Sequence, residues 1–443
     1  MIRTRLALLL STLLAGAGLL PAQAPSSSTQ LSDRLDWLDW RGPSQDGRAH
    51  SASKPPLEWD AASGENILWK TAIRGAGHST PVVLARHAWL TTATPDGTRM
   101  WALCIDVETG KILHDLLLKE NADPEPLGNP VNNYAAPSCA IELGAVYVHF
   151  GTYGTFCLDP LTGEEQWRRE DIHCRHYRGP GSSPIVWKDL LILSMDGVDV
   201  QYVTALNKKT GETVWKSDRI TDWDDLDKDG RPQREGDARK AYVTPIIATV
   251  DGEEQLITTA SKNAFGYDPA TGEQLWAYWH GGFSNASRPL FDPREGGIAY
   301  VNSGYGKAQL HAVKLAGARG TIDPATASWV RTKNVPNRST PVLLDGHLYS
   351  VDDGGITVCA DAATGKEVWR ERLRGKYAAS PVLAGGHLYF ISLEGFCSVV
   401  KASPTYEKVF ETKMPDGSGA SPAVTGNSLL LRTGTELYRI GAK

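Results

Sequence analysis

The sequence predicts an all-β protein, an eight-bladed β-propeller with four antiparallel strands in each blade. Its 443 residues include 44 glycines and 14 tryptophans, and helix-periodic stretches are scarce, which favours short strands joined by tight turns. A Ser-Pro or Thr-Pro pair, or a variant of it, opens a strand at eight places. Successive prolines lie 40 to 61 residues apart, the range expected for four-stranded blades. The pairs are Thr80-Pro81, Ala136-Pro137, Ser183-Pro184, Thr244-Pro245, Arg288-Pro289, Thr340-Pro341, Ser380-Pro381 and Ser421-Pro422.

Each repeat follows one plan, which is clearest in the third. Its four predicted strands cover 182–187, 190–194, 200–206 and 213–216. In other repeats the first turn is Asp-Gly or Gly-Gly, which accepts the positive φ angles of two-residue hairpins. The turn between the third and fourth strands has the form Asp/Asn-x-x-Thr-Gly at 106–110, 159–163, 207–211, 268–272 and 361–365.

A tryptophan stands four residues after the glycine in four of these five turns, with His114 as the exception. We expect these indoles, and that of an earlier tryptophan in the N-terminal strand, to wedge between adjacent blades and bury apolar area rather than to hold a cofactor. The five tryptophans are Trp69, Trp167, Trp215, Trp276 and Trp369.

The last repeat ends at Ile440 after three strands, whereas residues 66–70 form a strand without a blade. We therefore expect this N-terminal strand to complete the last blade and close the ring, which removes its exposed edges. The predicted organisation is a signal peptide at 1–24, an N-terminal extension at 25–65 and the propeller at 66–443. The part of the extension from residue 31 contains no clear blade, and both packing along the ring and partial mobility stay open.

The N-terminus has the pattern of a secretory signal peptide. Arg3 and Arg5 precede an apolar stretch at 6–20, and Pro21-Ala22-Gln23-Ala24 follows as a cleavage site. No cysteine precedes Cys104, so no lipid anchor is expected, and no run is long enough to span a membrane. A net charge of −5 argues against nucleic acid as a partner. We expect a monomer in the periplasm or secreted.

The motif D-x-x-T-G-x-x-x-W after Ser/Thr-Pro strands is similar to the PQQ-like propeller repeat, from about residue 66 onward. The entry segment Trp40-Arg-Gly-Pro-Ser-Gln-Asp-Gly47 adds to this resemblance to exported PQQ-like propeller proteins. The family includes quinoprotein alcohol dehydrogenases and the propeller lipoprotein of the outer-membrane β-barrel assembly machinery. The resemblance thus implies either an enzyme or a scaffold.

The cysteines do not follow the dehydrogenase pattern. The resemblance implies adjacent cysteines forming a disulfide over the quinone, a calcium site and a catalytic Asp. None of the six cysteines here is adjacent to another and no C-x-x-C-H occurs, which disfavours PQQ as a cofactor without excluding looser quinone binding. A disulfide between Cys139 and Cys174 and free buried thiols both stay open.

The long loops between blades should converge at the mouth of the central channel, where a ligand would bind. The alternative is that their polar residues cap turns and brace the blades. The candidate ligand-binding residues are Asn133, Tyr134, His173, His176, Arg178, Arg288, Asn302, Tyr305, Lys307, Arg338 and Lys376.

Two metal patterns occur. His173 and His176 have a spacing that suits two metal ligands, but no third ligand is identifiable, so hydrogen bonding is the preferred interpretation. Asp225, Asp227 and Asp229, followed by Gly230, have the D-x-D-x-D-G spacing of a calcium loop. The glutamate expected at the twelfth position is Gly236, so an exposed acidic loop is the alternative.

The sequence therefore predicts an exported, non-enzymatic binding propeller that presents its loop-rich face to a protein, a glycan or a small anionic ligand. No catalytic residue is identified. The alternative is an enzyme, either a PQQ-dependent oxidoreductase or a hydrolase built from funnel residues. Binding is preferred because the repeat accounts for nearly every motif without chemistry.

Overall fold

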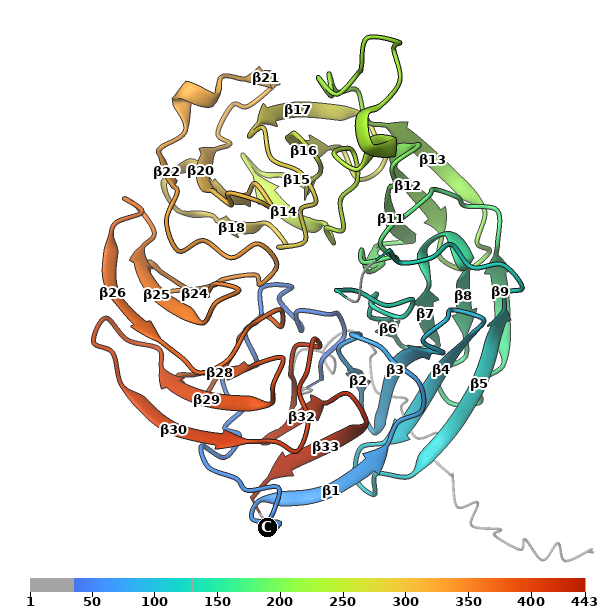
Figure 1. Cartoon of the computed structure of the whole chain (residues 1–443), viewed down its shortest axis with the longest axis vertical. Helices are drawn as coiled ribbons and strands as arrows, with labels where there is room; N and C mark the ends of the chain where they lie inside the picture. Colours follow the sequence, from blue (N-terminus) through green and yellow to red (C-terminus); the bar gives the residue numbers. More distant parts are fainter. Residues whose placement is uncertain (1–35, 129–130, 443) are drawn as a thin grey trace, which may run out of the picture. The chain divides into compact units, whose positions relative to one another are not determined.

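The computed structural model describes residues 36–128 and 131–442. It confirms the predicted propeller: eight sheets surround a central channel (Figure 1). Blades one to four consist of β2 (Val82–Leu84), β3 (His87–Ala93), β4 (Arg99–Asp106) and β5 (Ile112–Glu120); β6 (Ala140–Glu142), β7 (Ala145–His149), β8 (Thr155–Leu158) and β9 (Glu165–Arg169); β10 (Ile185–Trp187), β11 (Leu190–Asp196), β12 (Gln201–Asn207) and β13 (Thr213–Asp218); β14 (Ile246–Val250), β15 (Glu253–Thr259), β16 (Asn263–Tyr267) and β17 (Gln274–Trp279).

Blades five to eight continue the ring. They consist of β18 (Leu290–Asp292), β19 (Ile298–Asn302), β20 (Leu310–Lys314) and β22 (Trp329–Arg331); β23 (Val342–Leu344), β24 (His347–Val351), β25 (Ile356–Asp361) and β26 (Glu367–Arg372); β27 (Val382–Ala384), β28 (His387–Ile391), β29 (Phe396–Lys401) and β30 (Lys408–Lys413); β31 (Ala423–Thr425), β32 (Ser428–Arg432), β33 (Glu436–Gly441) and β1 (Ile67–Ala72). Short 3₁₀ turns occur at Gly151–Tyr153, Gln233–Gly236, Arg294–Gly296 and Pro324–Thr326.

Ring closure by the N-terminal strand is confirmed. β1 pairs antiparallel with β33 as the outermost strand of blade eight, with Trp69 opposite Arg439 and Ala72 opposite Glu436. A second addition was not predicted: β21 (Gly320–Ile322), from the long connection in blade five, pairs in parallel with β17 and gives blade four a fifth strand.

The Ser/Thr that opens the inner strand explains why the motif recurs. In most blades its hydroxyl accepts a hydrogen bond from the backbone N–H of the equivalent residue in the preceding blade, for example from Ser138 to Ser183 and from Thr340 to Ser380, at 2.8 to 2.9 Å. Thr80 differs, because its hydroxyl donates to Ser421 O of blade eight at 3.1 Å. In blade two the equivalent residue is Ser138, two positions after the predicted Ala136, because β6 begins at Ala140. A girdle of inter-blade hydrogen bonds therefore surrounds the channel.

The turn motif and its tryptophan lock neighbouring blades. The indole of Trp69 donates to Val107 O at 2.7 Å in the next blade, and a Cβ on Gly110 would lie 2.7 Å from that indole. Trp167, Trp215, Trp329 and Trp369 donate in the same way to carbonyls of the following blade. Trp276 instead donates to Gln255 within its own blade at 2.9 Å. The apolar core consists of clusters of buried side chains that pack between adjacent blades.

The segment 36–65 crosses the central channel before it enters β1 (blue in Figure 1). Trp37 pairs with Val83 of blade one, and Ala49 N–H bonds Leu383 O of blade seven at 2.8 Å. The sequence left two alternatives for this segment, packing along the ring and partial mobility, and the structure shows packing against the ring. No helix among the described residues is long and apolar enough to cross a membrane. The predicted signal peptide at 1–24 lies outside the described residues.

Candidate functional site

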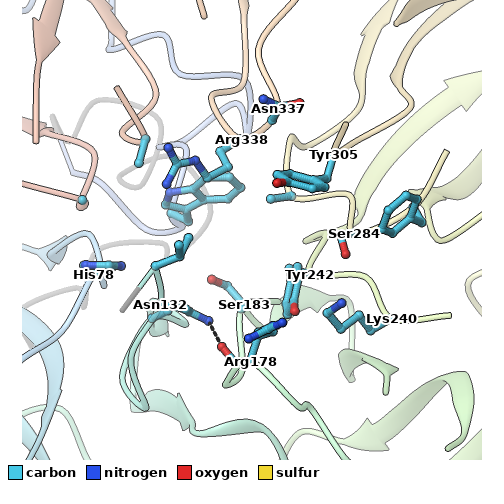
Figure 2. Close-up of a pocket in the computed structure, with 18 of the residues that line it drawn as sticks. His78, Asn132, Arg178, Ser183, Lys240, Tyr242, Ser284, Tyr305, Asn337 and Arg338 are labelled. Carbon is cyan, nitrogen blue, oxygen red and sulfur yellow. Dashed lines mark hydrogen bonds between the residues drawn. The ribbon is translucent and has the colours of Figure 1, made fainter. Parts of the chain in front are cut away.

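A cavity of about 360 Å³ occupies the channel at the end where the inner strands begin (Figure 2). We call the Ser or Thr that takes part in the girdle of inter-blade hydrogen bonds, or Arg288 in blade five, the girdle residue of its blade. The cavity wall contains, in every blade, the residue two positions before the girdle residue. Five of these eight residues are alanine or glycine and leave space, whereas His78, Tyr242 and Arg338 extend into the cavity wall. The small ones are Ala136, Gly181, Ala286, Ala378 and Gly419. One repeated backbone position therefore creates the cavity.

The floor is supplied by the N-terminal segment. Trp40 lines the cavity, and Asp39 and Arg41 beside it are buried. Arg41 donates to Pro381 O at 2.8 Å, and a Cβ on Gly47 would lie 1.9 Å from its guanidinium, so glycine is required there. Burial lowers the pKa of Arg41 to about 9, which leaves it charged at neutral pH. The motif Trp40–Gly47 thus forms a base to the channel.

Arg288 ties this base to the ring. Its guanidinium binds both carboxylate oxygens of Asp39, at 2.6 and 3.1 Å, and donates to Pro245 O at 2.7 and 3.0 Å. The contact to Pro245 joins blades four and five where Arg288 replaces a girdle hydroxyl. This predicted ligand residue is fully buried and does not line the cavity.

The described cavity wall carries a net positive charge. Four cationic side chains line it, against one carboxylate, Asp237, which pairs with Lys240. Arg338 pairs with Asp353 outside the cavity at 2.9 Å. The guanidinium groups of Arg178 and Arg234 have no ion-pair partner among the described residues. The cavity is suited to an anion.

His78 adds a neutral group to this wall. Burial, reinforced by the charges of Arg432 and Arg338, lowers the pKa of His78 to about 4. Arg432 is fully buried and donates to Ser79 Oγ at 2.6 Å and Thr91 O at 2.8 Å. At neutral pH the imidazole can therefore both donate and accept a hydrogen bond, but it adds no charge.

Of the predicted ligand residues, Arg178, Tyr305 and Arg338 line the cavity. Tyr305 is 62% exposed and forms an edge contact with Phe283 at 6.1 Å. Lys307 and Lys376 are exposed but do not line it.

The remaining predicted ligand residues hold loops in place. Asn133 accepts from Ala135 N–H, Tyr134 donates to Glu125 O, and Asn302 donates to Pro336 O. His173 contacts Thr152 Oγ1 at 3.2 Å, and His176 Nε2 accepts from Thr152 N–H at 3.0 Å. These contacts match the bracing alternative.

Carboxylates of the calcium-like loop contact other groups of the protein. Asp225 binds Arg239 through both carboxylate oxygens at 2.7 and 2.9 Å, and Asp227 Oδ1 accepts from the N–H groups of Asp229 and Arg231. Among the described residues, no group of three or more His, Cys, Asp or Glu side chains could hold a metal. All six cysteines lie in the described part of the chain and are buried and free, so Cys139 and Cys174 are not bonded.

A quinone with calcium does not fit this donor set. Asp237 is the carboxylate that lines the described cavity, and Lys240 engages it. Calcium prefers several carboxylate and carbonyl oxygens.

Trp40, His78, Lys240 and Tyr242 line the cavity but were not predicted. Aligning the repeats on the girdle residue and inspecting the position two residues before it would have found His78 and Tyr242. Lys240 and Trp40 carry no such signal, because they come from a long loop and from outside the repeats.

A family model described as outer membrane protein assembly factor BamB matches residues 22–194, 199–322 and 318–439. A search of curated proteins gives no match. The quinohemoprotein alcohol dehydrogenase of Comamonas testosteroni is 14% identical, with a TM-score of 0.64 over 92% of this chain and 81% of that one. BamB of Moraxella catarrhalis is 12% identical, with a TM-score of 0.57 over 84% and 99%.

A europium-containing methanol dehydrogenase is 14% identical, with a TM-score of 0.54 over 92% of this chain and 89% of that one. At these identities the solved structures show a shared fold and nothing about activity. The family model covers nearly the whole propeller. The chain therefore belongs to the PQQ-like propeller family whose model is described as outer membrane protein assembly factor BamB.

Proposed function

We propose that this protein is an exported, non-enzymatic binding propeller that holds an anionic ligand in its channel cavity. The observation that carries the proposal is the charge of the wall, where four cationic side chains face one carboxylate. Trp40 lines this cavity from the N-terminal segment, and a ligand would enter it from the loop-rich face. Arg3, Arg5 and the apolar stretch that follows support export.

The test is thermal unfolding of the mature protein with a panel of anions at low and high salt. The panel contains an acidic peptide, a sulfated glycan fragment and organic acids, each with a neutral analogue. We expect at least one anion, and no neutral analogue, to raise the melting temperature, and the shift to decrease at 0.5 M salt because exposed charges are screened.

The double variant Arg178→Gln/Arg338→Gln should abolish this shift, whereas Arg370→Gln on the exposed outer strand β26 should preserve it. No shift with any anion would refute the proposal. Retention of PQQ with Ca²⁺ after gel filtration, together with dye-linked alcohol oxidation, would instead establish the enzymatic alternative.

A further inference from the structure

Hydroxyl donors are concentrated on the cavity wall. Ser138, Ser183 and Ser421 line it, and each oxygen already accepts a backbone N–H of the preceding blade at 2.9 Å. None of these three hydroxyls donates a hydrogen bond to another described residue. Because a hydroxyl offers one hydrogen, each serine has a donor left for a ligand. The girdle that joins the blades therefore also presents O–H groups to the cavity.

Tyr242 supplies a further unused donor. Its hydroxyl is buried and has no hydrogen-bond partner among the described residues. Figure 2 shows it between Arg178 and Lys240. Burial, reinforced by Asp237 and opposed by Arg178, raises the pKa of Tyr242 well above its ordinary value, so the phenol stays protonated. A buried O–H beside two cations lacks an acceptor, and an oxyanion would provide one.

Two of the four cationic side chains, Arg178 and Arg338, lie at separate places on the wall. Arg178 belongs to the loop between blades two and three, and Arg338 to the loop between blades five and six. Three steps around a ring of eight place them on nearly opposite walls, as Figure 2 shows. A single small anion at one wall leaves the other unoccupied, whereas a ligand with two charged ends reaches both.

We propose that the ligand is a small organic acid with at least two carboxylates, one held by Arg178, Lys240 and Tyr242 and another by Arg338. This rests on the proposed function and specifies its ligand class. The serine hydroxyls would bind carboxylate oxygens between the two ends. The cavity volume of about 360 Å³ lies within the range of small-molecule sites.

The probe is tricarballylate, which has three carboxylates and no hydroxyl, measured by calorimetry at low salt and pH 7. We expect it to bind at least tenfold more tightly than butyrate or inorganic phosphate, because one carboxylate or one phosphate uses a single wall. Tyr242→Phe, Arg178→Gln and Arg338→Gln should each weaken binding about tenfold, since each removes a hydrogen bond to a charged group. Arg370→Gln is the matched control and should bind like the wild type.

Butyrate or phosphate binding as tightly as tricarballylate would overturn the two-ended ligand. Unchanged affinity in Tyr242→Phe, with an unchanged unfolding midpoint, would overturn its role as donor. If tricarballylate fails while the acidic peptide or sulfated fragment binds, the ligand class is wrong and the proposed function stands. If no anion binds, both fail.

Discussion

A single buried arginine joins three parts of this chain. Arg288 pairs with Asp39 of the N-terminal segment and bonds Pro245 O of blade four, while its own N–H bonds Thr340 Oγ1 of blade six at 2.9 Å. Its side chain is fully buried, and that of Asp39 is 10% exposed. A charge in such a place is tolerated because its partners are all present.

Replacing Arg288 by methionine should therefore strongly destabilise the fold. The change leaves the Asp39 carboxylate buried without its cation, which typically costs about 3 to 5 kcal/mol of unfolding free energy. The double variant Asp39→Asn/Arg288→Met should recover part of this loss, because no unpaired charge remains. Urea unfolding measures both, with Arg370→Met as control. A loss under about 1 kcal/mol for the single variant would contradict the role assigned to this pair.

Between neighbouring blades, stability depends on an indole lying flat on a glycine turn. Trp167 against Gly211, Trp215 against Gly272 and Trp329 against Gly365 repeat the contact, in each case closer than 2.8 Å to a Cβ built on the glycine. Where His114 replaces tryptophan, its ring nitrogen still meets Leu161 O of the next turn at 2.8 Å. The contact between this ring and the next turn is thus repeated in geometry even where the residue differs.

Two glycine substitutions distinguish the contribution of this contact to the unfolding free energy from that of backbone strain. Gly110 and Gly386 both have positive φ, +71° and +79°, but an added methyl meets Trp69 only at Gly110. Alanine at Gly386 should cost about 1 kcal/mol, from the backbone alone. Alanine at Gly110 should cost a further 1 to 3 kcal/mol, roughly, because the methyl displaces the indole. Equal losses in denaturant unfolding would show that the indole contact contributes little.

The same elements show how far the sequence could predict the structure. Repeated turns and strand openings predict the blades because each recurs as a short motif, and the hydrogen bonds of the turns are local. The shift from Ala136 to Ser138 could not be seen, since it depends on where β6 pairs. Arg178 and Arg338 were found in the cavity because long loops converge there, but Arg288 was placed with them although Asp39 buries it. Ion pairs 249 residues apart leave no local pattern.

For the molecule as a whole, acid sensitivity follows from its neutral histidines. Burial is the main cause in each case and lowers the pKa of five imidazoles to about 3 or about 4. They are His78, His149, His176, His280 and His311. In the unfolded chain a histidine titrates near 6.5. Unfolding therefore takes up protons between these pKa values.

The unfolding free energy should thus fall as the pH decreases from about 6.5 toward 4. Each histidine that is neutral when folded and protonated when unfolded contributes up to about 1.4 kcal/mol per pH unit. Urea midpoints at pH 7.5, 6.5, 5.8 and 5.2 measure the effect before most carboxylates titrate. The midpoint should be nearly constant above pH 7 and then decrease. A constant midpoint down to pH 5.2 would show that these imidazoles accept protons in the folded state.

The threaded N-terminal segment sets an order of events in folding. Hairpins within each blade are local and can form early. In contrast, Arg41 bonds Pro381 and the N–H of Lys54 bonds Asn427, and these partners lie 340 and 373 residues further along the chain. This segment is therefore synthesised before the blades, but it acquires its contacts with blades seven and eight only in a closing step that needs those last blades. Until that step, β33 keeps an open edge and the channel has no base. A chain interrupted before blade eight would assemble blades without ever becoming a ring.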